Sequence, residues 1–226
     1  MKRSELNEII RAGEKFIASF GFKMPEFATW TPEDWRRNKH RAREAIRARL
    51  GWDITDFGRG DFEDTGLLLF TIRNGSQENL RRGGGMVYAE KIMISRRNQI
   101  TPMHTHGVKT EDIIVRGGAP LEVQLYNAKP GGGADQDKPV VVRMDGIEHE
   151  VKAGGVVRIQ PGCSITLEPG HLHSFWGAGG DSLVGEVSVV NDDETDNYFL
   201  DMVSRFPDVE EDEPPYRLIV PDYAKL

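Results

Sequence analysis

Hydrophobic residues in the first twenty positions recur at spacings of three and four, which places them on one face of an amphipathic helix. The recurring residues are Leu6, Ile9, Ile10, Phe16, Ile17 and Phe20. Gly21 interrupts the pattern directly afterwards. The spacing therefore predicts a helix over residues 4–20.

A second helix is predicted from a start signal at Thr31. Its hydroxyl can accept a hydrogen bond from an unpaired N–H of the first turn, and Pro32 suits the first helical position. The two acidic residues that follow suit the positive end of the helix. The predicted helix runs to Leu50, and Gly51 supplies the left-handed position after it. We interpret its six arginines as a solvated face.

After Gly51 the hydrophobic period changes to two, the period of a β-strand. The apolar runs are short, rich in β-branched and aromatic residues, and separated by turn residues such as Gly, Pro, Asn and Asp. They occupy residues 67–73, 86–94, 121–126, 140–144, 156–159, 164–167 and 183–190. The pattern predicts a mainly β protein, a sandwich or a barrel, over residues 51–226. Residues 1–50 form a helical extension, and without a linker between them we expect one folding unit.

Composition narrows the class of protein. The chain has 226 residues, of which 38% are hydrophobic and 29% charged, so disorder, collagen and coiled coil have no support. A net charge of −7 disfavours binding to nucleic acid, which needs a basic surface. A single cysteine, Cys163, excludes an internal disulfide, and no apolar run approaches the ~20 residues that span a bilayer. We therefore expect a cytoplasmic protein without membrane or nucleic-acid partners.

Histidines form the strongest candidate site. His104 and His106 are two residues apart, so in an extended strand their side chains project to the same side. Glu111 follows where the next apolar run begins and can return a carboxylate to the same place. A third imidazole from a later hairpin, either His171 or His173, would complete the set. Nitrogen and carboxylate ligands suit manganese, iron, nickel or zinc better than a soft metal.

The same residues resemble the two motifs of the cupin family. The first motif is matched by His104, His106, Glu111 and Gly118, and the second by Gly162, Gly170 and His173. Glu168 stands where the family has proline, and Pro169 is shifted by one position. The spacing from Gly170 carries the ligand role to His173, with His171 as its competitor. The resemblance implies a small β-barrel, the double-stranded jelly roll, that holds one metal.

A finer resemblance, to bacterial D-lyxose ketol-isomerases, extends over nearly the whole chain, the helical extension included. The matching segments are residues 50–55, 69–75, 88–93, 101–104, 109–114, 169–176 and 184–193. That family is a manganese-dependent, dimeric one that interconverts D-lyxose and D-xylulose, and often D-mannose and D-fructose. The resemblance therefore implies Mn²⁺ as cofactor, a homodimer, and sugar substrates of this class.

Aldose–ketose isomerisation moves a proton between C2 and C1 of the sugar. The reaction needs a group that polarises the carbonyl, which a divalent metal can supply, and a base that reaches both carbons. Glu186 is the candidate base, because it is the one charge in an otherwise apolar strand. An ionised carboxylate inside a barrel is costly unless it is paired or functional. The alternative is that Glu186 faces solvent on an edge strand.

Four further residues are candidates for the reaction or for sugar binding. Lys109 lies between two of the candidate ligands, where its ammonium can donate a proton or stabilise a negative oxygen, although a solvated turn lysine is the alternative. Lys91 and Glu90 have opposite strand parity, and we favour Lys91 as the inward donor to a sugar hydroxyl. Asp193 is a candidate hydroxyl ligand or an ordinary turn residue. Trp176 is a candidate wall of the sugar pocket or a packing residue.

Two other functions would use part of the same set. An iron-dependent cupin dioxygenase would use the three imidazoles and the carboxylate, but it has no need of Lys109 and Glu186 beside the metal. A non-catalytic sugar-binding cupin would bind sugar without forming a ketose. The sequence favours the isomerase because both charged residues accompany the ligand motif.

Overall fold

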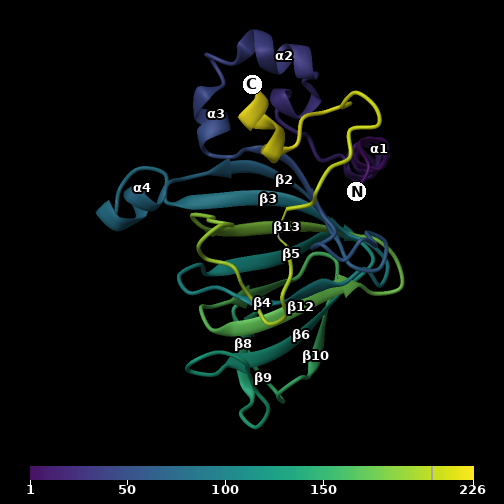
Figure 1. The fold of residues 1–226 in the computed structure, drawn as a ribbon. Coiled ribbons are helices and arrows are strands. Elements are labelled where there is room, and N and C mark those ends of the chain that lie inside the picture. The colour runs from purple at the N-terminus through teal and green to yellow at the C-terminus, as the bar shows by residue number, and fades with distance from the viewer. Residues whose placement is uncertain (205) are drawn as a thin grey trace.

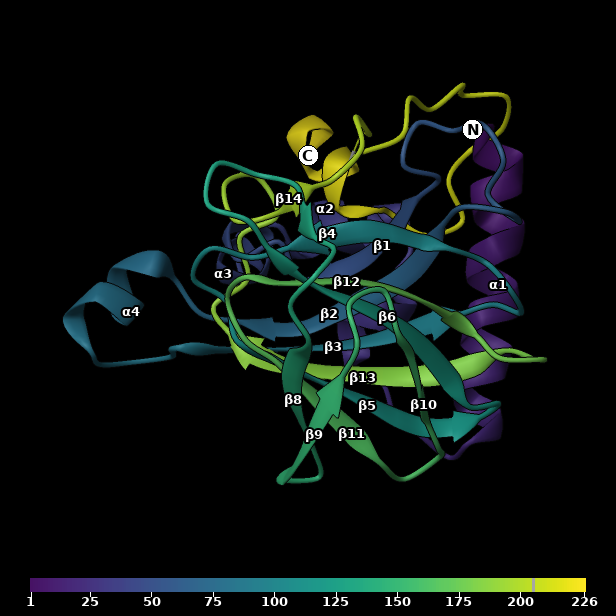
Figure 2. The same ribbon diagram turned by 90° about the horizontal axis from the view of Figure 1, so that it is seen from below.

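Two antiparallel β-sheets face each other in the computed structural model, which describes residues 1–204 and 206–226 (Figure 1). Helices lie against one side of the larger sheet, and both chain ends lie on that same side of the molecule (Figures 1 and 2). The predicted fold class, a mainly β jelly-roll barrel with an N-terminal helical extension, is confirmed.

The first predicted helix is confirmed as α1, whose buried face includes Leu6, Ile10 and Ile17. The helical elements are α1 (Arg3–Ser19), η1 (Glu26–Thr29), α2 (Pro32–Asn38), α3 (Arg43–Arg47), α4 (Gln77–Arg82) and η2 (Val220–Lys225), where η marks a 3₁₀-helix. Within the described residues, none of the helices combines the length and apolar character needed to cross a membrane.

The second predicted helix is wrong as a continuous element, because residues 39–42 form turns between α2 and α3. At the end of α2 the N–H of Lys39 bonds the carbonyl of Arg36, three residues back, at 3.4 Å, and the side chain of Asn38 donates to the carbonyl of Asp34 at 2.9 Å. Arg49, at φ 56°, takes the left-handed conformation after α3. Gly51, at φ 126°, begins the first strand instead of ending the helix.

The larger sheet has the strand order β1-β2-β3-β13-β5-β11-β8-β9. Its strands are β1 (Gly51–Thr55), β2 (Leu67–Asn74), β3 (Tyr88–Ser95), β13 (Ser182–Val189), β5 (Glu111–Gly118), β11 (Ser164–Leu167), β8 (Val140–Met144) and β9 (Ile147–Val151). The smaller sheet has the order β10-β6-β12-β4-β14, with β7 paired to β6. Its strands are β10 (Val156–Ile159), β6 (Leu121–Ala128), β12 (His171–Gly177), β4 (Thr101–Thr105), β14 (Tyr198–Phe199) and β7 (Ala134–Asp135).

Apolar side chains on both faces of the larger sheet form two separate layers. Leu67 and Leu69 of β2 belong to the cluster between the sheets, together with residues of β5, β6, β8 and β12. Leu68 and Phe70 of the same strand belong to a second cluster, which includes Ile10 and the rest of the buried face of α1. The helix α1 supplies apolar partners for the outer face of the larger sheet. Because apolar packing is available there, the inner face can also carry polar side chains.

A buried arginine joins α1 to the C-terminal segment. Arg3 is 1% exposed, and its guanidinium contacts both carboxylate oxygens of Asp222 at 2.7 and 2.9 Å. The same side chain contacts Glu211 at 2.8 and 2.9 Å. Bidentate pairs of this kind fix geometry as well as charge. The two ends of the chain are therefore held together on the outer face of the larger sheet.

Replacing Arg3 with methionine should lower the free energy of unfolding by about 3–5 kcal/mol, because the carboxylate of Asp222 would stay buried without its cation. Denaturant unfolding followed by circular dichroism measures the change. Arg81→Met on the exposed side of α4 is the matched control and should cost far less. A loss at Arg3 as small as that of an exposed ion pair, about 1 kcal/mol or below, would contradict this assignment.

Candidate metal centre and active-site pocket

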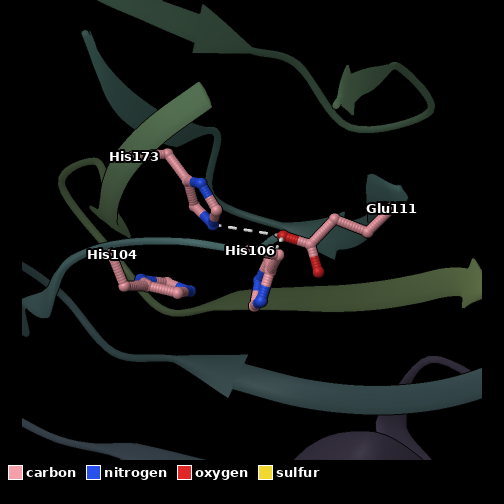
Figure 3. Close-up of side chains that lie close together, drawn as sticks. All are labelled: His104, His106, Glu111 and His173. Carbon is pink, nitrogen blue, oxygen red and sulfur yellow. Dashed lines mark ion pairs between the residues drawn. The ribbon is translucent and has the colours of Figure 1, made fainter. Parts of the chain in front are cut away.

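Three histidines and one glutamate meet inside the barrel (Figure 3). His104 lies on β4, His106 follows the end of that strand, and His173 on β12 pairs in register with His104. Glu111 begins β5 in the larger sheet, so the cluster draws on both sheets. One ligand atom from each residue lies within 4.8 Å of the others.

Each imidazole uses its Nδ1 atom for a backbone carbonyl. The contacts are His104 to Pro102 at 2.8 Å, His106 to Asp196 at 2.6 Å and His173 to His171 at 3.1 Å. A ring that donates its Nδ1–H to a carbonyl keeps the lone pair of Nε2 available for a metal. The buried Nε2 atoms of His106 and His173 have no hydrogen-bond partner among the described residues. A bound metal ion would therefore supply the partner that these Nε2 atoms lack.

The protonation states of Glu111 and His104 also suit a divalent metal. Glu111 Oε1 lies 3.1 Å from Nε2 of His173 and 3.5 Å from Nε2 of His106. Burial opposes ionisation of Glu111, but the Lys109 ammonium and His106 hold its pKa well below the ordinary value. Burial and the neighbouring imidazoles hold the pKa of His104 well below its ordinary value. An anionic carboxylate and neutral imidazoles are the forms that bind metal.

Buried charges continue from the cluster across the larger sheet. Lys109 Nζ lies 2.6 Å from Glu111 Oε2 and 3.2 Å from Glu186 Oε1. Lys91 Nζ lies 3.3 Å from the same Glu186 oxygen, because Lys91 and Glu186 are direct partners across β3 and β13. Ser188 Oγ donates to that oxygen at 3.2 Å. Burial alone would lower the pKa of Lys109, but the carboxylates of Glu111 and Glu186 raise it, so its ammonium is retained.

These charged groups line one cavity inside the barrel. Its apolar walls include Phe57, Phe175 and Phe199. Asp193 and Asn197, from the segment after β13, supply further polar groups, and Asn197 Nδ2 donates to Asp193 Oδ1 at 3.1 Å. The cavity thus has one charged side and one apolar side, as a pocket for a small polar molecule does.

Most of the residues singled out from the sequence line this one cavity. They are His104, His106, Glu111, Lys91, Lys109, Glu186 and Asp193, with His173 completing the cluster. Glu186 is 4% exposed on a strand flanked by β3 and β5, so it is not on an edge. Lys91 is 4% exposed, whereas the side chain of Glu90 is 28% exposed and pairs with Arg73.

Two residues do not reach the cavity. The expectation that Trp176 forms its wall is corrected by strand parity, because the neighbouring Phe175 lines the cavity in its place. The indole of Trp176 donates to Glu122 Oε2 at 2.8 Å on β6. His171 lies outside the cluster, and its Nδ1 accepts the N–H of Glu168 at 3.1 Å.

Several residues around the cavity were not found from the sequence. Phe57 and Phe199 lie in short, irregular stretches without a period, and Asn197 follows an acidic turn. Asp196 is 6% exposed, although the acidic and amide residues around it are typical of a solvent-exposed loop. Only contacts between segments far apart in the sequence identify these residues, so no local signal was available to find them.

The family model and two full-length relatives agree on one family. The model of the D-lyxose isomerase family matches residues 1–223. A D-lyxose/D-mannose isomerase of Serratia proteamaculans is 46% identical, over 100% of this chain and 99% of that protein. One of Escherichia coli O157:H7 is 44% identical, over the full length of both chains. A solved L-ribose isomerase variant of Acinetobacter sp. DL28, in complex with L-ribose, shares the fold with a TM-score of 0.61, at 14% identity over 93% of this chain and 98% of that one.

Replacing His173 with alanine should weaken Mn²⁺ binding more than tenfold, since even residues that only orient a ligand contribute about 10–100-fold to metal affinity. His171→Ala is the matched control, two positions away on the same strand, and should bind Mn²⁺ normally. Titration of the metal-free proteins with Mn²⁺, followed by electron paramagnetic resonance, measures both dissociation constants. Weakened binding in His171→Ala with normal binding in His173→Ala would reverse the assignment.

Proposed function

Because this chain belongs to the D-lyxose isomerase family, whose members are aldose–ketose isomerases, we propose that it interconverts D-lyxose with D-xylulose and D-mannose with D-fructose. The observation that carries this proposal is the run of buried charges through Lys91, Glu186 and Lys109 in the same cavity as the His/Glu cluster. A dioxygenase has no use for these charges beside its metal. Neither that alternative nor a non-catalytic sugar-binding protein has support from the comparisons.

We propose that one divalent ion, Mn²⁺, is held by Nε2 of His104, His106 and His173 and by the carboxylate of Glu111. The support is the donor set, three nitrogens and one carboxylate without a thiolate, and the Nε2 atoms of His106 and His173 that lack a hydrogen-bond partner among the described residues. When bound, the ion supplies Lewis acidity that polarises the sugar carbonyl.

Glu186 is the proposed base. Its hydrogen bonds from Lys109 and Ser188 fall on Oε1, which leaves Oε2 as the oxygen that approaches the substrate carbons. The carboxylate takes the proton from C2 of the aldose, and the resulting carboxylic acid returns a proton to C1 of the enediol, which completes the ketose. The ammonium groups of Lys91 and Lys109 lie 3.3 and 3.2 Å from Oε1 and hold that end of the carboxylate in place.

The ammonium of Lys109 has a separate role in the proposed reaction. It hydrogen-bonds the sugar oxygen at C1 as negative charge develops there and donates a proton to it, then recovers a proton from the oxygen at C2 when the new carbonyl forms. Lys91 and Asp193 orient the remaining hydroxyls. Lys91 is held for this role by Glu186 and by Asn191, whose Oδ1 accepts its ammonium hydrogen at 2.6 Å.

We further propose a cytoplasmic homodimer in which residues 1–50 and 51–226 fold as one unit. The packing of α1 on the larger sheet and the Arg3–Asp222 pair support a single unit. Exposed apolar side chains at β9 and β10, Ile147 and Val156 among them, are sites that a second copy can cover. A lone cysteine is consistent with a reducing compartment.

The proposed activity is tested by a ketose assay on pentoses and hexoses. Protein stripped of metal and reloaded with Mn²⁺ should form D-xylulose from D-lyxose and D-fructose from D-mannose under strict anaerobiosis, because isomerisation consumes no oxygen. The stripped protein should be inactive. Saturable sugar binding without any ketose would support the sugar-binding alternative, and a product that forms only with oxygen would support the dioxygenase.

Glu186→Gln should lower kcat by about 10²–10⁴-fold while sugar and Mn²⁺ still bind, because the amide keeps the shape of the side chain and loses its basicity. Glu90→Gln on the adjacent strand is the control and should stay close to wild type, since Glu90 faces away from the cavity. In D₂O the wild-type ketose should carry deuterium at C1. A normal rate for Glu186→Gln would remove Glu186 from the mechanism.

A further inference from the structure

We propose that Asp196 is a positioning residue that holds the loop between β4 and β5 in the shape required for metal and sugar binding. The proposal deepens the proposed function, because this loop carries Lys109 between two of the proposed ligands, His106 and Glu111. Asp196 itself lies ninety residues further along the chain, in the segment that follows β13.

The carboxylate of Asp196 is wrapped by three consecutive backbone amides of that loop. Its Oδ1 accepts the N–H groups of Gly107 and Val108 at 2.8 and 3.0 Å, and its Oδ2 accepts the N–H of Lys109 at 2.9 Å. Successive N–H groups that point inward form an anion-binding concavity. Here the occupying anion comes from the same chain, and it is 6% exposed.

The backbone of the same residue orients a proposed ligand. The carbonyl of Asp196 accepts the Nδ1–H of His106 at 2.6 Å, which leaves Nε2 of that ring directed into the cluster. Partners that bind the second nitrogen of a ligating histidine set its tautomer and ring orientation. The carboxylate fixes where Asp196 sits, so the loop contacts and the imidazole contact depend on each other.

Other contacts hold the two ends of the loop, where the carbonyls of His106 and Thr110 each accept a backbone N–H at 3.1 Å and Lys109 forms its ion pairs. The middle of the loop is exposed. Val108 is 58% exposed, and Gly107 is exposed as well. A Cβ at Gly107 would stand 3.2 Å from Asp196 Oδ1 and 3.3 Å from the ring of Tyr198, so a larger residue there would press on both side chains. Without the carboxylate the three amides would turn towards water. The backbone of Lys109 would then no longer be held in place, and the position of its ammonium would be less well defined.

Asp196 also connects the metal centre to the opposite side of the cavity. The segment that it anchors supplies Asp193, Asn197 and Phe199 to the cavity lining. One carboxylate therefore sets the relative placement of the ligand loop and of the segment that would contact the sugar hydroxyls. This dual contact distinguishes Asp196 from the other acidic residues of the segment.

Asp192 provides a matched control. Its carboxylate also accepts three hydrogen bonds, from the N–H groups of Glu194 and Thr195 and from the hydroxyl of Thr195. All of them stay within the turn and none reaches the ligand loop. Asp192→Asn therefore perturbs the same segment without touching the loop. In the native protein both carboxylate oxygens of Asp196 accept hydrogen bonds from the loop. Asp196→Asn keeps only one acceptor oxygen, and Asp196→Ala keeps none.

The first measurement is amide hydrogen exchange in the metal-free protein, which needs no sugar and no activity. We expect exchange at residues 107–109 to be at least about tenfold faster in Asp196→Asn and faster again in Asp196→Ala, because amides without an acceptor exchange with water. Exchange in α1 should be unchanged, which shows that the variants are folded. Asp192→Asn should match wild type at residues 107–109.

The second measurement is the Mn²⁺ dissociation constant. The third is kcat and KM at saturating Mn²⁺. Asp196→Asn should raise the dissociation constant about 10–100-fold and should lower kcat even when fully loaded. Unchanged exchange at residues 107–109, or an equal effect of Asp192→Asn, would overturn the proposal. If wild-type protein forms no ketose, the proposed function is wrong. Hydrogen exchange at residues 107–109 and the Mn²⁺ dissociation constant would still test the role of Asp196.

Discussion

Ionised side chains buried inside the barrel impose the strongest constraint on this structure. Glu111, Glu186, Lys91 and Lys109 are each 4% exposed or less, and a charge of either sign would be unstable there alone. Each is placed within 3.3 Å of an opposite charge, so the four compensate one another. The strand register that pairs Lys91 with Glu186 is therefore fixed by electrostatics as well as by apolar packing.

The layered arrangement of the fold makes room for these charges. The apolar cluster between the sheets also forms the apolar side of the cavity, since Leu67, Leu69 and Met93 belong to both. The helix α1 adds a second apolar layer outside the larger sheet, with Leu68, Phe70 and Ile92 facing it. Burial of apolar area on the outside offsets the polar groups admitted inside. The helical extension thus contributes to the site without contacting it.

Local periodicity predicted the parts of the site that lie on regular strands. The spacing of His104 and His106 placed both side chains on one side. Parity showed that only one of Lys91 and Glu90 faces inward, and the structure has Lys91 in the cavity lining. The same parity, counted from His173, places Phe175 inside and Trp176 outside, but the sequence interpretation of Trp176 did not apply it.

Contacts between distant segments lay beyond such reasoning. Asp196 reaches a loop almost ninety residues earlier, and the turns at residues 39–42 that separate α2 from α3 contain no proline or glycine to indicate a break. The helix α4, capped by the hydroxyl of Ser76, interrupts a hairpin between two strands that both belong to the core. Irregular segments such as these depend on tertiary partners, which a single sequence does not display.

The residues of the His/Glu cluster come from both sheets, so the cluster is completed late in protein synthesis. His104 and His106 leave the ribosome first, Glu111 soon afterwards, and His173 only when most of the barrel has been made. The complete ligand set exists only after β12 has paired with β4 across the smaller sheet and β5 has joined the larger one. If the cluster holds a metal as proposed, a nascent chain that ends before β12 would offer an incomplete set of ligands and bind metal weakly. Selection between ions of similar chemistry would then wait until the barrel has closed.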